Sequence, residues 1–223
     1  MSINLIIPAG GSSNRYSTEK SKLQELINNK SILEHTISAF SKTTSITKII
    51  IAYPENDSDW FNKIKQNFSN VILIKGGKTR AESVLNAFSQ ISETECSYVM
   101  IHDAARPNVS QQLIDRIIKT SENEPAIIPG IKVTDTLKEV ENNKVKNTIN
   151  REQYVAVQTP QLFSYSLLKR CYESIQDIAS FTDEGSLVEA LNQPVHIIDG
   201  EKPNIKITHP IDLSILNILM NKD

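Results

Sequence analysis

Short runs of β-branched and aliphatic residues alternate along this chain with segments whose apolar positions recur at helical spacing. Buried strands are predicted at 3–7, 46–53, 71–74, 97–101 and 126–129. Amphipathic helices are predicted between them, at 31–40, 54–68, 81–91 and 111–121. Strands that alternate with helices are typical of an α/β fold, so we expect a doubly wound, mostly parallel, Rossmann-like sheet with right-handed crossovers.

The alternation of strands and helices stops after residue 129. Residues 130–150 alternate in strand fashion around Glu141-Asn142-Asn143-Lys144, which is a turn signal, and predict a protruding β-hairpin arm at about 132–151. Such an arm has little of its own to pack on, so we expect it to contact a second copy in a homodimer. The rest of the chain predicts helices at 164–176 and 183–192, a strand at 195–198, a loop over 200–207 that runs into a short strand, and a terminal helix that starts at His209-Pro210.

Composition narrows the class of protein. At 223 residues, 39% hydrophobic and 22% charged, the chain fits one soluble domain over 1–223. A net charge of −2 argues against a nucleic-acid binder that works through a basic face. No apolar run approaches the roughly 18 residues of a membrane span, and the first strand lacks the basic flank of a signal peptide. We therefore expect a cytoplasmic protein, in which Cys96 and Cys171 are buried free thiols.

The first predicted strand runs into a glycine and serine loop. Gly10 and Gly11 lack a Cβ, so this backbone can take positive φ values and bring its N–H groups close to an anion. Arg15 and Lys22 add two cations, which favours a polyphosphate ligand over the ordinary βα turn that remains the alternative. The loop lacks the GKS/T ending of a P-loop and the G-x-G-x-x-G dinucleotide fingerprint, which disfavours a Rossmann dehydrogenase.

Two further strands end in residues suited to a ligand. Gly76-Gly77 form a second glycine loop, after which Ser83 either meets a ligand hydroxyl or caps its own helix. Asp103 directly follows a buried strand, where it could hold Mg²⁺ or cap the next segment. For His102 a hydrogen bond in the core is favoured over a role as base, and Arg106 could clamp a phosphate or pair with a carboxylate. In open α/β sheets, ligands bind at the edge formed by the carboxyl ends of the strands, where these residues are predicted to lie.

Cations dominate the predicted loops: Arg15, Lys22, Arg80, Arg106, Arg151 and Lys206. No Ser/His/Asp order, cysteine nucleophile or paired carboxylates stand out beside them. This composition indicates chemistry on phosphates, where catalysis consists of positioning and charge stabilisation. A phosphate oxygen that acts as nucleophile needs no general base, because its second pKa of about 6 leaves it mostly ionised at neutral pH.

Several motifs occur in one order along the chain: Ile7-Pro8-Ala9-Gly10-Gly11, Arg15, Lys22, Gly76-Gly77, Arg80-Ala81-Glu82-Ser83-Val84, His102-Asp103-Ala104-Ala105-Arg106-Pro107, Asp135-Thr136, Arg151, Thr159-Pro160-Gln161, Thr182-Asp183-Glu184 and Asn204-Ile205-Lys206. Together they resemble the 2-C-methyl-D-erythritol 4-phosphate cytidylyltransferase family. The resemblance runs from residue 3 to about 213.

The resemblance implies that the chain transfers a cytidylyl group from CTP to methylerythritol phosphate, in the non-mevalonate isoprenoid pathway. It also implies Mg²⁺ as cofactor and a homodimer whose arm completes the neighbouring site. By motif position it implies catalytic roles for Arg15, Lys22, Arg151 and Lys206; nucleotide binding by Ala9, Gly10, Gly11, Gly77, Ser83, Asp103 and Ala104; substrate binding by Arg106, Thr136 and Thr182; and metal binding by Asp103.

The chain departs from the family pattern at a few positions. Ser13 and Asn14 stand where the family usually has Gly and a second Arg, which weakens the expected triphosphate contacts. Ser21 and Leu23 flank Lys22 in place of Pro and Gln, and Lys78 replaces a common acidic residue. None of these departures removes a residue assigned to the chemistry.

Two other functions stay open at this stage. Ribitol-5-phosphate cytidylyltransferases are similar through the first loop, but they tend to have bulkier residues than Ala104-Ala105. A non-catalytic nucleotide-binding dimer would not need both Arg15 and Lys22, nor both Arg151 and Lys206. The sequence therefore favours the methylerythritol phosphate enzyme.

Overall fold

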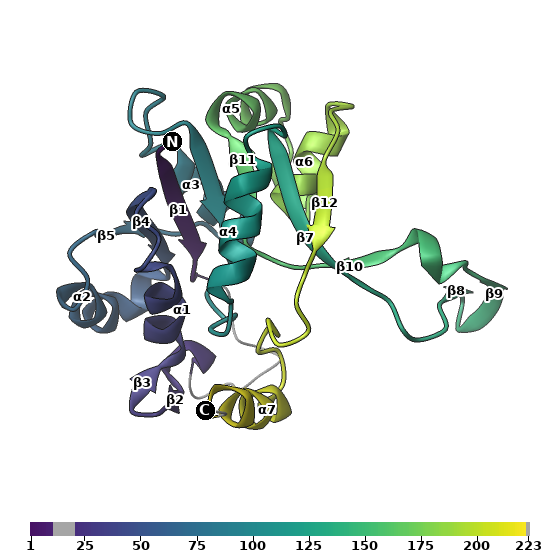
Figure 1. The fold of residues 1–223 in the computed structure, drawn as a ribbon, viewed down its shortest axis with the longest axis horizontal. Coiled ribbons are helices and arrows are strands. Elements are labelled where there is room, and N and C mark those ends of the chain that lie inside the picture. Colours follow the sequence, from purple (N-terminus) through teal and green to yellow (C-terminus); the bar gives the residue numbers. More distant parts are fainter. Residues whose placement is uncertain (11–20, 222–223) are drawn as a thin grey trace.

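The computed structural model describes residues 1–10 and 21–221 and contains one central sheet of eight strands in those residues (Figure 1). The strands are β1 (Ile3–Pro8), β4 (Ile46–Tyr53), β5 (Val71–Lys75), β6 (Tyr98–Ile101), β7 (Ala126–Lys132), β10 (Val155–Val157), β11 (Gln161–Ser164) and β12 (His196–Asp199). Their order is β10-β7-β11-β6-β1-β4-β5, and β12 also pairs with β7. Only β10 and β11 pair antiparallel with their neighbours, so the predicted mostly parallel sheet is confirmed for these residues.

Helices cover both faces of this sheet. One core contains side chains of α1 (Ile32–Phe40), α2 (Ser58–Gln66), α4 (Gln111–Thr120) and α7 (Pro210–Met220). The other contains side chains of α3 (Arg80–Phe88), α5 (Tyr165–Ser174) and α6 (Glu184–Ala190). Along β1, Leu5 and Ile7 belong to the first core and Ile6 to the second, as expected for a strand buried on both faces. The predicted doubly wound architecture is therefore confirmed.

Short elements connect the larger ones. They are the 3₁₀ helices at Lys22–Gln24, Glu55–Asp57, Arg151–Gln153 and Ile178–Ser180, and the hairpin of β2 (Leu26–Ile27) and β3 (Lys30–Ser31). A capping box begins α1: the Ser31 hydroxyl accepts from the Glu34 amide, and the Glu34 carboxylate accepts from the Ser31 amide. Cys96 and Cys171 are buried free cysteines, as predicted.

One predicted strand is wrong, and some observed strands, β11 among them, were not predicted. Residues 205–207 form no strand; the Ile207 amide donates to the Ala105 carbonyl at 2.9 Å, and the side chain of Ile207 is fully buried. The apolar side chain of Ile207 is therefore buried, as the pattern indicates, but the backbone here does not pair with a neighbouring strand. Conversely, β11 inserts antiparallel between β6 and β7, where the pattern predicted a loop and then a helix from residue 164.

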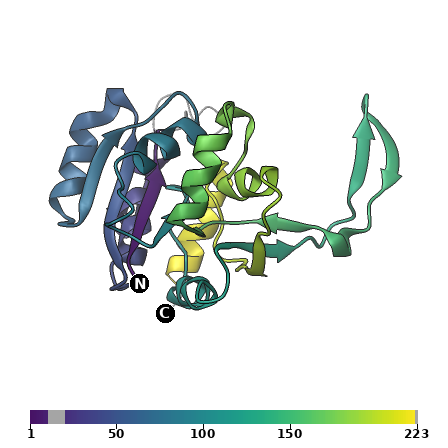
Figure 2. The same cartoon turned by 90° about the horizontal axis from the view of Figure 1, so that it is seen from above.

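The predicted hairpin is present as an arm that extends away from the sheet and helices (Figures 1 and 2). It consists of β8 (Lys138–Glu141) and β9 (Lys144–Thr148), joined by Asn142 and Asn143 with φ values of 50° and 61°. Val140 and Val145 are 59% and 62% exposed, so the arm does not bury its own apolar side chains. Among the described residues, none of the helices is long and apolar enough to cross a lipid bilayer.

Candidate active site

Gly10, which follows β1, and Gly76, in the second glycine loop, both lie close to Ser83. The Ser83 hydroxyl accepts from the Gly77 amide at 3.0 Å and donates to the Thr79 carbonyl at 2.8 Å. A Cβ added to Gly76 would lie 2.9 Å from the Ser83 Oγ, and one added to Gly10 would lie 3.4 Å from it. The Ala9 amide donates to the Ala52 carbonyl at 2.8 Å, which fixes the end of β1.

Close approach, rather than backbone conformation, explains these glycines. No described glycine has a positive φ, so Gly10 does not use the conformational freedom that a glycine has. A Cβ on Gly77 would lie 2.3 Å from the Glu82 Cβ, a distance that real side chains do not reach. The loop can therefore fold back onto the first turn of α3 only with glycine at this position.

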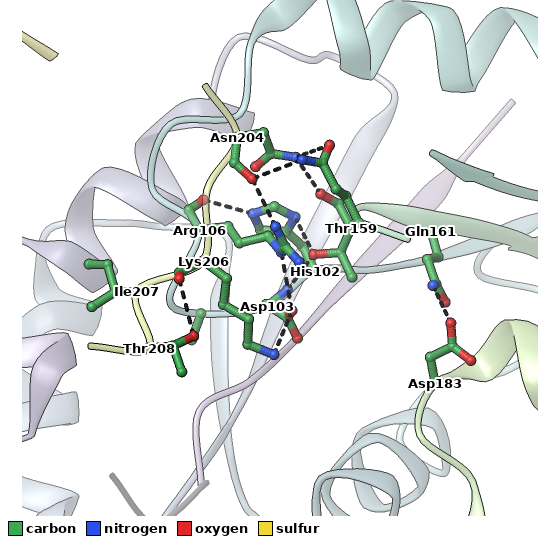
Figure 3. Close-up of polar contacts among 12 residues, drawn as sticks. His102, Asp103, Arg106, Thr159, Gln161, Asp183, Asn204, Lys206, Ile207 and Thr208 are labelled. Carbon is green, nitrogen blue, oxygen red and sulfur yellow. Dashed lines mark hydrogen bonds and ion pairs between the residues drawn. The ribbon is translucent and has the colours of Figure 1, made fainter. Parts of the chain in front are cut away.

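The Asp103 carboxylate contacts three cations, two of which, Arg106 and Lys206, are labelled in Figure 3. Its Oδ2 is 2.9 Å from Lys206 Nζ and 3.3 Å from Arg106 Nε, and its Oδ1 is 3.4 Å from Arg80 Nε. Burial raises the pKa of Asp103, but the charges of Lys206, Arg80 and Arg106 outweigh burial and hold that pKa well below its usual range. Asp103 is therefore ionised, and it does not cap a helix, because none begins at this point.

A buried network of neutral groups fixes the backbone around Asp103. The Asp103 amide donates to Thr159 Oγ1 at 3.0 Å, and Thr159 Oγ1 is 3.2 Å from Nδ1 of His102. On the other side of the ring, His102 Nε2 lies 2.9 Å from the Arg106 carbonyl, to which it donates. Burial lowers the pKa of His102 to about 4, so the ring is neutral and serves as a structural hydrogen-bonding group. This agrees with the prediction for His102.

A second set of hydrogen bonds holds the loop that carries Lys206. The Asn204 carboxamide donates to the Thr159 carbonyl at 2.8 Å, and the Asn204 carbonyl accepts from Arg106 Nη1 at 2.8 Å. Gln158 Nε2 donates to the Glu201 carbonyl at 2.8 Å. Because these residues have little or no exposed surface, they fix this loop against the end of β6. Arg106 thus pairs with a carboxylate, one of the two roles considered for it.

Lys22 reaches the same loop from the N-terminal part of the chain. Its Nζ donates to the Ile207 carbonyl at 2.8 Å, one residue beyond Lys206. Lys22 and Lys206 therefore approach one segment from two distant parts of the sequence.

A cavity of about 230 Å³ opens beside Asp103 and is lined by both polar and charged side chains. Its lining residues are Arg80, Asp103, Arg106, Val157, Gln158, Thr159, Gln161, Thr182, Asp183 and Lys206. The structure thus brings four predicted site residues together here: Asp103, Arg106, Thr182 and Lys206. Ala104 lies next to them but is buried in the core, where its carbonyl accepts from the Thr36 hydroxyl at 2.8 Å.

Thr136 and Arg151 do not line this cavity. They belong to the arm, where the Arg151 guanidinium donates to the Thr134 carbonyl and lines a separate cavity with Lys132, Val133, Thr134, Glu152, Tyr154 and Val155. Gly11 and Arg15, also predicted site residues, lie outside the described residues. Within one subunit, the predicted site is therefore divided between the body and the arm.

The ion pair between Arg80 and Glu184 was not predicted from the sequence. Arg80 Nη1 and Nη2 contact Glu184 Oε1 and Oε2, both at 3.0 Å, and Glu184 is 1% exposed. Burial raises the pKa of Glu184, and the charge of Arg80 opposes that shift. A signal was present, because Glu184 precedes the buried Leu187 and Val188 by three and four residues and therefore lies on the inner face of its helix.

Comparison with known proteins identifies the family. The family model described as 2-C-methyl-D-erythritol 4-phosphate cytidylyltransferase (IspD) matches residues 3–222. The chain belongs to this family. A relative of that name from Bacillus cytotoxicus is 40% identical over 215 residues, which are 95% of this chain and 94% of the relative.

Solved structures of the family have the same fold. The 4-diphosphocytidyl-2C-methyl-D-erythritol synthase of Anaerococcus prevotii superposes with a TM-score of 0.85 at 27% identity, over 99% of both chains. The Francisella tularensis 2-C-methyl-D-erythritol 4-phosphate cytidylyltransferase superposes with a TM-score of 0.84 at 31% identity, over 98% of this chain and 99% of the other. The resemblance read from the motifs is thereby confirmed over nearly the whole chain.

IspD enzymes are nucleotidyltransferases, which generally use a divalent metal. The described residues contain no group of three or more His, Cys, Asp or Glu side chains that could hold one. As it lies here, the Asp103 carboxylate does not fit a metal, because each oxygen already contacts a cationic nitrogen at 2.9–3.4 Å. Metal binding by Asp103 stays a prediction that requires Lys206 to move.

Proposed function

We propose that this chain transfers the cytidylyl group of CTP to 2-C-methyl-D-erythritol 4-phosphate, releasing pyrophosphate, in the non-mevalonate isoprenoid pathway. The family membership carries this proposal. The site supports it, because three cationic side chains, Arg80, Arg106 and Lys206, line the cavity beside Asp103 and Asp183. Guanidinium and ammonium groups form strong, charge-assisted hydrogen bonds with phosphate oxygens.

Nucleotide binding is assigned to the two glycine loops and the end of β6, that is, to Ala9, Gly10, Gly11, Gly77, Ser83, Asp103 and Ala104. The close packing of Gly10 and Gly76 against Ser83 supports this assignment, since it places the end of β1 beside the second glycine loop. Ser83 already bonds Gly77 and Thr79, so its first contribution is to hold the second loop in shape.

The chemical step is an in-line displacement. A phosphate oxygen of methylerythritol phosphate attacks the α-phosphorus of CTP, a new P–O bond forms, and the bond to the β-phosphate oxygen breaks with loss of pyrophosphate. Lys22 and Arg15 would stabilise the negative charge that develops on the α-phosphate. His102 is not a base in this scheme, because burial lowers its pKa to about 4 and both ring nitrogens are already hydrogen-bonded.

The second substrate would lie between the body and an arm. Arg106, Thr182 and Lys206 line the cavity and would contact the sugar phosphate from one subunit. We propose that Arg151 and Thr136 come from the arm of a second copy in a homodimer. The exposure of Val140 and Val145, and of Val155, Val157 and Ile197 near the base of the arm, supports a partner surface in this region.

Three further assignments complete the proposal. Residues 1–223 act as a single cytidylyltransferase domain with the arm at about 132–151, and the enzyme works in the cytoplasm. The metal is Mg²⁺, which usually binds substrate phosphates together with one or two carboxylates. Phosphate oxygens of the nucleotide would hold it, and Asp103 would join them only after releasing Lys206.

Pyrophosphate release from the purified protein with Mg²⁺ tests the reaction. CTP, UTP and ATP are each combined with methylerythritol phosphate and with ribitol 5-phosphate. We expect release only from CTP with methylerythritol phosphate. Release with ribitol 5-phosphate would change the substrate, and no release from a folded protein that binds CTP would favour a nucleotide-binding protein without catalysis.

A further inference from the structure

A buried ion pair joins the first residues of two helices behind the cavity. Arg80 begins α3 and Glu184 begins α6, and the two side chains meet through two parallel N–H···O bonds of 3.0 Å. This two-point geometry fixes the plane of the guanidinium group as well as its position. Its third donor, Nε, then points to Asp103 Oδ1 at 3.4 Å.

The pair is linked through Asp103 to a residue of the chemistry. Asp103 Oδ1 faces Arg80, while Oδ2 faces Lys206 at 2.9 Å and Arg106 at 3.3 Å. Because Arg80 also pairs with Glu184, its positive charge is shared between two carboxylates. Arg80 therefore attracts only one oxygen of Asp103, and the other oxygen, Oδ2, stays in contact with Lys206.

We infer that Arg80 and Glu184 are positioning residues: Glu184 holds Arg80, Arg80 orients the Asp103 carboxylate, and Asp103 sets the place of the Lys206 ammonium group. The inference rests on the proposed function for its effect on turnover. The structural part of the inference, that Glu184 on α6 determines the position of Lys206, does not rest on the proposed function.

The charges predict what happens when Glu184 loses its charge. With glutamine at position 184, Arg80 still has one hydrogen-bond acceptor there but no negative charge. Arg80 then attracts the Asp103 carboxylate more strongly and competes with Lys206 for it. Lys206 is then less restrained. Glu184 does not line the cavity, so such a change reaches the substrate only through the other members of the network.

The first test does not depend on activity. The rate at which acetic anhydride modifies Lys206 is measured by mass spectrometry in the whole protein, with exposed Lys202 as internal reference. In Glu184→Gln we expect Lys206 to react about threefold faster relative to Lys202, with a similar change in Arg80→Lys, which keeps the charge but loses the two-point contact. Glu189→Gln, an exposed position on the same helix, is the matched control and should leave the ratio unchanged.

The second test uses a double-mutant cycle with Lys206→Met. Glu184→Gln should lower kcat/KM for methylerythritol phosphate about tenfold, while the affinity for CTP stays within about twofold. Combined with Lys206→Met it should add little further loss, because both changes act on the same contact. Arg80→Lys serves in the same cycle if Glu184→Gln does not fold.

The outcomes separate this inference from the proposed function. An unchanged Lys206 reaction ratio in folded variants, or additive losses in the cycle, would overturn the positioning role. Parallel loss of CTP affinity would show a general structural defect and would overturn it as well. A wild-type protein without turnover, whose Lys206 still responds to Glu184→Gln, would overturn the proposed function and leave the positioning role standing.

Discussion

At the scale of single residues, the site separates groups that carry charge from groups that hold them in place. Asp103, Arg106, Lys206 and Lys22 present charge, whereas His102 and Thr159 are neutral and buried. The neutral state of His102 is a consequence of burial, because its hydrogen bonds to the Arg106 carbonyl and to Thr159 leave no water to solvate an imidazolium.

His102 therefore makes stability depend on pH. Its pKa is about 4 in the folded chain and near 6.5 when unfolded, so unfolding takes up a proton between these values. Neutral His102 contributes fully to the free energy of unfolding above about pH 6.5, and this contribution is lost as the pH falls towards 4. The loss amounts to at most about 3 kcal/mol of unfolding free energy. Urea unfolding at about pH 7 and about pH 4.5 measures this slope.

The matched variant is His102→Gln, which keeps one donor and one acceptor but does not titrate. It should be less stable than the wild type at neutral pH and should show a flatter dependence between the two pH values. Equal slopes in both proteins would assign the acid sensitivity to other groups, such as the carboxylates of Asp103 and Glu34.

At the scale of elements, the proposed nucleotide-binding site depends on how tightly the second glycine loop, Gly76-Gly77, folds onto α3. Ala in place of Gly77 would put its Cβ 2.3 Å from the Glu82 Cβ, so the loop must shift and the bond from the Gly77 amide to Ser83 is lost. We expect Gly77→Ala to weaken CTP binding about tenfold, the effect of one lost hydrogen bond.

Calorimetric titration with CTP alone measures this effect without the second substrate. Gly185→Ala is the matched control, because its Cβ would make only ordinary contacts, the shortest at 3.4 Å to an Asp183 oxygen. If both variants bind CTP like the wild type, the loop of Gly76 and Gly77 is not part of the nucleotide site.

The same scale shows how far the sequence predicts this protein. Repeated β-branched runs are long enough to identify β1, β4 and β6, and a doubly wound sheet brings their ends to one edge. β11 is four residues long, as is β6, but it starts with a polar residue, Gln161, that is buried through a bond to Asp183, so the apolar pattern does not mark it as a strand. The pairing of Arg80 with Glu184 spans 104 positions and depends on that same sheet order.

At the scale of the whole molecule, the predicted site residues that the structure describes are divided between the body and the arm. Arg106, Thr182 and Lys206 line the cavity, whereas Arg151 and Thr136 lie on an arm that leaves the body (Figure 2). If a second copy supplies the arm, each site combines Lys22 of one subunit with Arg151 of the other. Two inactive variants can then complement each other.

Mixing Lys22→Ala with Arg151→Ala tests this arrangement. Each variant alone should lose turnover by roughly 100-fold or more, because each lacks a cation that stabilises or orients the reacting phosphates. In a mixed dimer one site carries both substitutions and the other carries neither. Equal mixing gives mixed dimers in about half of the population, so about one quarter of all sites should regain wild-type turnover.

Subunit exchange is a condition of this result, and native mass spectrometry of differently tagged variants measures it directly. The matched control mixes Lys22→Ala with Lys30→Ala, an exposed position on β3, where activity should equal the sum of the separate proteins. Recovery of activity in verified mixed dimers requires that Lys22 and Arg151 act from different subunits. Mixed dimers without recovery would mean that the arm acts within its own chain, and a protein that sediments as a monomer at full activity would mean that no partner arm is needed.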